Sequence, residues 1–452
     1  MIREGIRMKI ALVFIIVLLV ILPALAFTVR GDGVTLKSRI QMFLSFSLSL
    51  MQFFLSLLTI FLACSSLSHE VREKFIHLIA VKPIPRWQFL TGKWLGIMVL
   101  DAALLAGCGG MIYGFARYLK TLPPVNELDA YGVEQEVFTA RAGVKLKPPE
   151  AEIAAGVEAA IRQLQQEGRL PVNPDPELEQ RTREENRRRL QTEYLTVPPA
   201  GGVRVYYFRD LLVNRESDQV LYIRYRGSPG QVPQDEIWHT QWLVGDPELR
   251  TRVVLLEQKD PAGRYSTVMV PAACVSEDGT LRVAIRNLDG YAALALTGDE
   301  GGMELLYQLG GFGWNFVRAL ALTYCRLVFL AALGLLMSSF LSFPVACMAS
   351  LLVFFIGIAS GFLTEAIENT APLGESPALG PLNLTLRMLA TGIRWVVPNL
   401  SACDPVPAIV DGRAVGLIWI GNTVVQLVVP AFVLGVLASV IFTKRELAQV
   451  IV

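Results

Sequence analysis

The sequence predicts an all-α membrane protein of six transmembrane helices, with a large α+β insert between its third and fourth helices. Several charge-free apolar runs reach the roughly 18 residues that mark a membrane span. Between residues 118 and 313 the chain is polar, and its period changes from helical to alternating. The net charge of the 452 residues is only +1, which argues against nucleic-acid binding.

The first apolar run extends from Ile10 to Phe27 and follows Arg3, Arg7 and Lys9. Basic flanks hold such an end in the cytosol. A cleaved signal peptide is the alternative, because the run is short and Ala24-Leu25-Ala26 has the composition of a cleavage site. We expect a retained helix, because a retained first span places the loop after the second span in the cytosol.

Two further apolar runs, Ile40 to Leu67 and about Trp94 to Phe115, predict the second and third spans within a first region of residues 1–117. The third span contains Asp101, about 10 Å from its cytosolic end at 1.5 Å per residue. Small residues on this span favour close approach of a neighbouring helix. They are Gly107, Gly110 and Gly114.

The segment 68–90 between these spans combines a short amphipathic helix with prolines and basic residues. Its apolar positions, Val71, Phe75, Leu78 and Ile79, are spaced for one helix face. Pro83 ends the helix, which is too short to cross a bilayer. We therefore expect it to lie along the membrane surface with its charged face in the cytosol.

This segment resembles the coupling segment of type 2 ABC exporter permeases. The family pattern is an acidic residue, a short amphipathic helix, Lys-Pro, Arg, an aromatic residue and Gly-Lys. The matching residues here are Glu70, Lys82, Pro83, Arg86, Trp87, Gly92 and Lys93. Many relatives carry Thr or Gly-Thr about where Lys74 and Phe75 stand in this chain. A basic cytosolic loop that only sets topology is the alternative interpretation.

The resemblance implies a permease that pairs with a second permease copy, or a homologous one, in contact with membrane lipids. Separate ATPase subunits would bind ATP and Mg, so no cofactor is expected in this chain, which lacks a GxxxxGK[ST] loop. The expected coupling residues are Glu70, Arg72, Glu73, Lys82, Pro83 and Arg86, and the expected interface anchors are Trp87, Gly92 and Lys93. Ordinary snorkelling also explains Arg86 and Lys93. The family is commonly bacterial, which implies the plasma (inner) membrane, with both termini cytoplasmic.

Residues 118–313 predict an extracytoplasmic domain. Helical patterns cover about 149–195, and short alternating runs separated by turn signals predict a β-sandwich over 200–300. Trp238 and Trp242 share one face of a predicted strand. Exposed tryptophans could stack on a sugar, but we favour a place in the core. His239 has no neighbouring ligand residue, so it reads as structural and no metal site is expected.

The last region, 314–452, predicts three more spans: about Ala319 to Ser342, Pro344 to about Leu363, and Gly416 to Phe442. The first two are joined by a tight turn. An external loop, 365–415, precedes the last span, and its amphipathic part, Leu384 to Val397, lies at the outer surface or dips into it.

Asp101 and Arg326 are the two clearly intramembrane charges, and an unpaired charge is expensive there. Arg326 lies about 15 Å deep by residue count, close to the depth of Asp101. We predict that they pair, within one chain or across a dimer. Cys274 and Cys403 fall outside the spans and could form a disulfide, although their spacing gives no such signature.

Two functions remain compatible with these patterns. The first is the permease subunit of an ABC-type exporter, whose substrate the sequence does not indicate. The alternative is a membrane-anchored binding or assembly protein whose external β domain recognises a partner or glycan. Enzyme motifs such as HExxH, CxxC and GxSxG are absent from the sequence, so we do not expect an enzyme.

Overall fold

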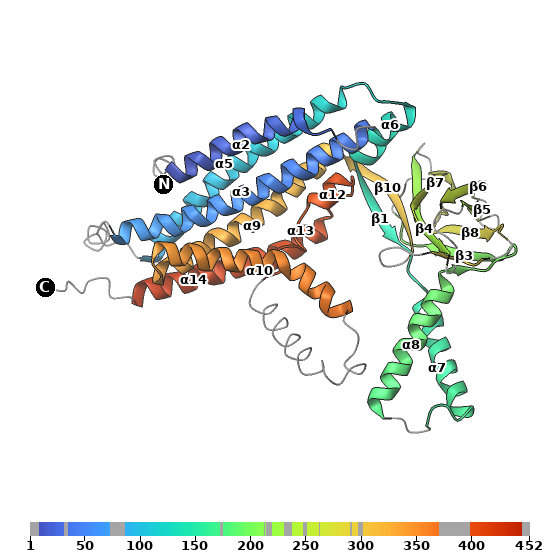
Figure 1. The fold of residues 1–452 in the computed structure, drawn as a ribbon. Coiled ribbons are helices and arrows are strands. Elements are labelled where there is room, and N and C mark those ends of the chain that lie inside the picture. Colours follow the sequence, from blue (N-terminus) through green and yellow to red (C-terminus); the bar gives the residue numbers. More distant parts are fainter. Residues whose placement is uncertain are drawn as a thin grey trace. The chain divides into compact units, whose positions relative to one another are not determined.

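The computed structural model forms two compact units, Met1–Ala140 with Gly310–Val452, and Arg141–Leu309, each of which is described by itself (Figure 1). The first is called the membrane unit and the second the insert. The structure describes residues 9–30, 35–72, 86–171, 175–211, 213, 219–229, 237–246, 251–261, 263–289, 292–296, 302–369 and 398–444.

Long apolar helices build the membrane unit. They are α2 (Lys9–Thr28), α3 (Leu36–Arg72), α5 (Arg86–Lys120), α9 (Phe312–Phe340), α10 (Phe343–Asn369) and a last helix of three parts, α13 (Leu417–Thr423), η3 (Val424–Val428) and α14 (Val429–Lys444). Among the described residues, five stretches are long and apolar enough to cross a membrane. The described part of α2, Val13–Thr28, is shorter. A multi-pass membrane protein is therefore supported, and the sixth crossing stays a prediction.

Helix α9 lies at the centre of the membrane unit. Of its apolar stretch 78% is buried, against 17% for the last helix. It packs against α3, α5, α10 and α14. Close approach to α3 requires Gly334, because a Cβ there would lie 2.6 Å from the Cβ of Ala63. The predicted close-packing positions, Gly107, Gly110 and Gly114, instead have open space, and Gly109 contacts Leu320.

The segment after α5 belongs to the membrane unit, which moves the boundary of the insert from residue 118 to residue 141. This segment forms α6 (Glu127–Gly132) and η1 (Val133–Val137). The buried carboxylate of Asp129 accepts hydrogen bonds from the amides of Leu36 and Lys37, at 2.9 and 3.0 Å. Asp129 thereby satisfies free N–H groups at the start of α3. This contact fixes the α5–α6 connection to the beginning of α3.

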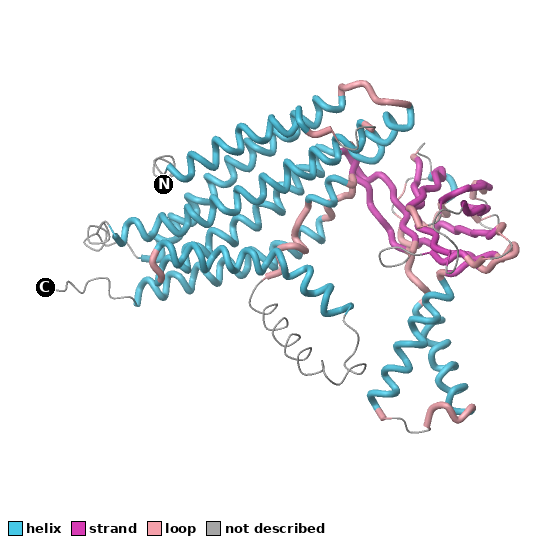
Figure 2. Tube along the Cα trace, in the orientation of Figure 1, coloured by secondary structure: helices cyan, strands magenta, loops and turns pink. Residues whose placement is uncertain are grey.

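The insert consists of a helical pair and a strand-rich part (Figure 2). The strands form two sheets with antiparallel pairing. The helices α7 (Glu150–Gln166) and α8 (Pro176–Tyr194) confirm the predicted helical region. The strands are β1 (Thr139–Lys145), β2 (Thr196–Val197), β3 (Val203–Phe208), β4 (Val220–Pro229), β5 (Ile237–Val244), β6 (Val254–Pro261), β7 (Tyr265–Pro271), β8 (Leu281–Asn287), β9 (Leu294–Leu296) and β10 (Met303–Gly311). A short helix, η2 (Ala272–Cys274), follows β7.

One sheet has the order β1-β10-β4-β9-β2, with β7 also paired to β4, and the other has the order β3-β8-β5-β6. Buried residues of both sheets share a single core, so the predicted two-sheet arrangement is present. Trp238 and Trp242 lie in this core, as favoured from the sequence, and the indole of Trp242 donates to Thr240 Oγ1 at 2.9 Å. Strands β1, β2 and β10 lie outside the region 200–300 in which strands were predicted.

We predict that Gly334→Val destabilises the membrane unit, because the added side chain must displace α3. Overpacking of this kind costs about 1–3 kcal/mol. Thermal unfolding of the full chain in a mild detergent measures the effect, and we expect a clearly lower midpoint. The control is Gly107→Ala, which adds a methyl group in open space on a helix and should leave the midpoint unchanged or slightly higher. Equal midpoints for the two variants would contradict the tight α3–α9 contact.

Candidate functional site

The predicted coupling segment lies largely outside the described residues. This holds for residues 73–85, which include Glu73, Lys82 and Pro83, and for the side chains of Glu70, Arg72 and Arg86. The backbone of α3 continues to Arg72, and α5 begins at Arg86. The expected docking of an ATPase on this segment therefore stays a prediction.

The three expected anchors at the start of α5 differ in their surroundings. The side chain of Trp87 is 56% exposed, as an interfacial aromatic residue would be. Gly92 has no neighbouring atom within 4 Å of a Cβ position. Lys93 is only 4% exposed, and its ammonium group donates to the carbonyl of Ser66 on α3. Lys93 therefore ties α5 to α3, whereas it was expected to be an anchor at the membrane interface.

Apolar contacts strengthen the same end of the bundle. Leu67 of α3, Leu90 of α5 and Phe442 of α14 form a buried cluster. The rings of Phe89 and Phe442 stack with centroids 6.3 Å apart. The two helices that flank the coupling segment are thus joined to each other and to the last helix. A displacement of either flanking helix is transmitted to all three.

A buried polar cluster surrounds Arg326, halfway along α9. Its guanidinium donates to Gln52 Oε1 at 3.2 Å and to the carbonyl of Leu400 at 2.7 Å. Gln52 in turn donates to Thr323 Oγ1 at 3.1 Å. The carboxylate of Asp404 adds a favourable electrostatic interaction with the guanidinium. Arg326 is therefore held by neutral acceptors from two separate elements, with a carboxylate nearby.

The segment 398–405 enters the bundle as non-helical backbone. Leu400 is fully buried, and its amide donates to the carbonyl of Gly357 at 3.1 Å, halfway along α10. The side-chain oxygen of Asn399 accepts from Ser360 and Ser401, at 3.0 and 2.7 Å. Irregular backbone is tolerated at membrane depth only when protein groups satisfy it. Part of the predicted external loop thus dips into the bundle, while Leu384 to Val397 lies outside the described residues.

Asp101 has a different partner and does not pair with Arg326 within the chain. It is fully buried, and its Oδ2 accepts from Thr59 Oγ1 at 2.9 Å. Gln52, which holds Arg326, is seven residues before Thr59 on α3. Two helical turns correspond to about 10 Å, so the two charges lie at different heights along α3. Counting residues from the helix ends had placed the two charges at nearly equal depths and did not account for this difference in height. Pairing of Asp101 with Arg326 across a dimer stays a prediction.

The partners of these charges include residues that the sequence analysis did not single out. Gln52 and Thr59 share one face of α3, since they are seven residues apart. The sequence did indicate that Gln52 has a polar partner, because a side-chain amide within a charge-free apolar run needs a hydrogen-bond partner in the bundle. The carbonyl of Leu400 gave no signal, since every residue carries one.

The disulfide considered between Cys274 and Cys403 is not formed, and both thiols are buried in separate units. Cys274 is enclosed by the core of the two sheets. Burial raises the pKa of its thiol to about 11, so it stays protonated at neutral pH. Cys274 therefore acts as a small core residue.

The outer face of the sheet β3-β8-β5-β6 carries an apolar row that crosses all four strands. Strand register aligns Val205, Ala284, Leu243 and Leu255. Leu255 is 59% exposed, Val205 and Leu243 are half-buried, and Ala284 is buried. Arg286 lies in the neighbouring row. Apolar side chains gathered on one exposed face are typical of an interaction surface. The exposed end of this row, at Leu255, is a candidate contact point for another macromolecule.

We predict that Arg326→Leu destabilises the chain by about 1–3 kcal/mol, because it leaves the buried Leu400 carbonyl without a donor. Asp101→Asn should change stability much less, since the amide oxygen still accepts from Thr59. The combined variant should equal the sum of the two single changes, because the residues share no contact. Thermal or denaturant unfolding of the full chain measures this. A strong departure from additivity would contradict this and support direct pairing of Asp101 with Arg326.

The chain matches no family model, no curated protein and no solved structure. Its function is therefore inferred from its own residues and their geometry.

Proposed function

We propose that this chain is the membrane subunit of an ABC-type exporter, driven by separate ATPase subunits that dock on segment 68–90. The observation that carries the proposal is the sequence pattern from Glu70 to Lys93. It begins in the last turn of α3 and ends in the first turns of α5, and both helices contain a stretch of membrane length. Because the chain lacks a P-loop, ATP and Mg would bind on the partner. The proposal includes a dimer of permeases in the plasma membrane with both termini in the cytosol.

The packing around the segment supports a mechanical role. An ATPase pair that closes on ATP would push the segment, and Lys93 ties its two flanking helices together. A shift of α3 would move Gln52 and Thr59, the partners of both buried charges. Through Arg326 the movement would reach the buried carbonyl of Leu400. A path of direct contacts thus links the proposed docking site to the irregular backbone inside the bundle.

The test is a gentle purification of the full chain from its native cells, followed by mass spectrometry of the proteins that remain bound. We expect a P-loop ATPase with the wild type and its loss with Glu70→Ala combined with Arg72→Ala. The matched control is Glu185→Ala with Arg189→Ala, which removes the same side chains from exposed positions of α8.

An ATPase retained by both double variants would keep the exporter and move the docking site elsewhere. The absence of an ATPase from the wild type would contradict the exporter. Equal loss from both double variants would point to a general effect of charge removal.

The alternative, a membrane-anchored binding protein, is favoured by one observation, the apolar row on the outer face of β3-β8-β5-β6. Burial of Trp238 and Trp242 argues against the version in which these rings stack on a glycan. A protein partner fits better, because Arg282 and Arg286 on β8 flank the apolar row. If the chain is a binding protein for such a partner, Leu243→Asp with Leu255→Asp should remove that partner from the same purification and leave any ATPase bound.

A further inference from the structure

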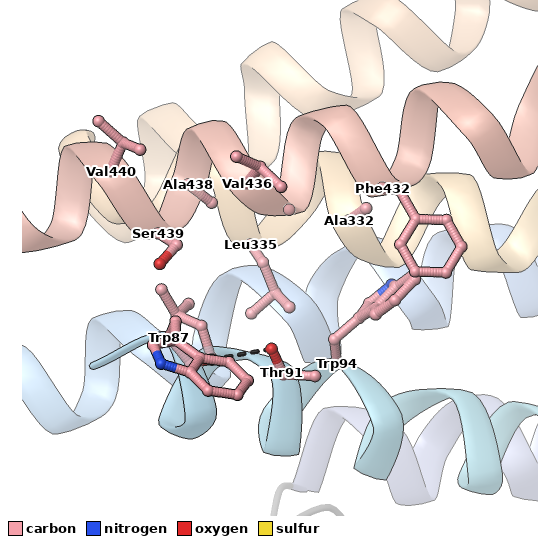
Figure 3. Close-up of a pocket in the computed structure, with 12 residues that line it drawn as sticks. Trp87, Thr91, Trp94, Ala332, Leu335, Phe432, Val436, Ala438, Ser439 and Val440 are labelled. Carbon is pink, nitrogen blue, oxygen red and sulfur yellow. Dashed lines mark hydrogen bonds between the residues drawn. The ribbon is translucent and has the colours of Figure 1, made fainter. Parts of the chain in front are cut away.

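A cavity of ≈ 290 Å³ opens between α5, α9 and α14 in the membrane unit (Figure 3). The residues that define its shape are Trp87, Trp94, Leu335, Phe432, Val436 and Ser439. It lies close to the cluster that joins α3, α5 and α14, because Leu90 belongs to both.

Most of the cavity wall is apolar, and two of its polar groups are already satisfied. The indole N–H of Trp94 donates to the carbonyl of Val328 at 3.3 Å, so this residue offers only its ring. The hydroxyl of Thr91 donates to the carbonyl of Trp87 at 2.8 Å within α5. Leu335, Phe432 and Val436 complete the wall. This part of the cavity suits a hydrocarbon chain.

One end of the cavity is different. The indole nitrogen of Trp87 and the hydroxyl of Ser439 have no hydrogen-bond partner among the described residues. Figure 3 shows both at the same end, away from Phe432 and Trp94. A matching ligand therefore has an apolar chain and, at one end, an oxygen that accepts hydrogen bonds. Phospholipids have this distribution, with ester and phosphate oxygens next to acyl chains.

The position of Trp87, at the second residue of α5, agrees with this ligand. Half-exposed tryptophans gather at the level of the headgroups, where one side of the ring is apolar and the N–H is in a polar layer. The helices around the cavity are of membrane length, so lipid is the solvent that surrounds them.

We propose that this cavity binds one acyl chain of a membrane phospholipid, whose ester or phosphate oxygens accept hydrogen bonds from Trp87 and Ser439. The proposal requires a membrane-embedded chain but is independent of the exporter. A bound chain would fill the space between α5 and α14, the helices that Phe89 and Phe442 join.

The full chain, delipidated in a mild detergent, is titrated with phosphatidylethanolamine that carries bromine on its acyl chains. Bromine quenches tryptophan fluorescence, and Trp87 and Trp94 are two of the seven tryptophans. We expect saturable quenching in the wild type. Gly435→Leu fills the cavity, since Gly435 lines it and has open space at its Cβ position, and should weaken binding about tenfold or more. The matched control, Gly421→Leu, adds the same side chain in open space on α13 and should bind as the wild type does.

Native mass spectrometry with unlabelled phosphatidylethanolamine tests the polar end. Trp87→Phe with Ser439→Ala keeps the apolar wall and should weaken binding about fivefold, as expected for lost hydrogen bonds. Unsaturable quenching in the wild type, or equal binding by Gly435→Leu, would overturn the site. Equal weakening by Gly421→Leu would assign the effect to helix perturbation and overturn it as well. Full affinity of the Trp87 and Ser439 variant would overturn the headgroup contact.

Discussion

The rule that most constrains the membrane unit is that a buried polar group needs a partner inside the protein. Arg326 meets this rule with an amide on α3 and a backbone carbonyl from segment 398–405. The same bonds let an irregular piece of chain enter an otherwise helical bundle. Helix α9, which carries the guanidinium, is also the most buried membrane-length helix among those described. Helix α9 therefore both carries the buried charge of Arg326 and forms the centre of the packed bundle.

Helix α3 connects the parts of this unit that matter for the proposed function. At one end its amides are held by Asp129, and toward the other end its Ser66 carbonyl accepts from Lys93. Between them, Gln52 and Thr59 hold the two buried charges. A force applied near Ser66, at the end of α3 next to the coupling segment, acts on a helix that is hydrogen-bonded to its neighbours along its length. We therefore expect α3 to move together with these neighbours. This is the property that a transmitting element requires.

Sequence patterns identified those features that depend on local composition. The apolar runs located the membrane-unit helices, and the helical pattern over about 149–195 located α7 and α8. Alternation placed Trp238 and Trp242 in a strand core. These patterns failed where partners are distant. Strands β1 and β10 carry charged residues and pair with each other from opposite ends of the insert sequence. Arg326 binds a backbone carbonyl, a group that every residue carries and that a sequence pattern therefore cannot single out. The proposed docking segment has a recognisable pattern, yet most of its side chains, those of residues 68–86, lie outside the described residues.

The pairing of β1 with β10 has a consequence for how the chain is assembled. These two strands are the first and last of the insert and are neighbours in one sheet. Leu146 bonds Met303, and Gly143 lies beside Leu306, so the strands run in opposite directions and the start of one adjoins the end of the other. Neighbouring strands are about 5 Å apart. The two ends of the insert are thus adjacent. Deleting the insert and joining its ends by a short linker would therefore not require the flanking helices to move.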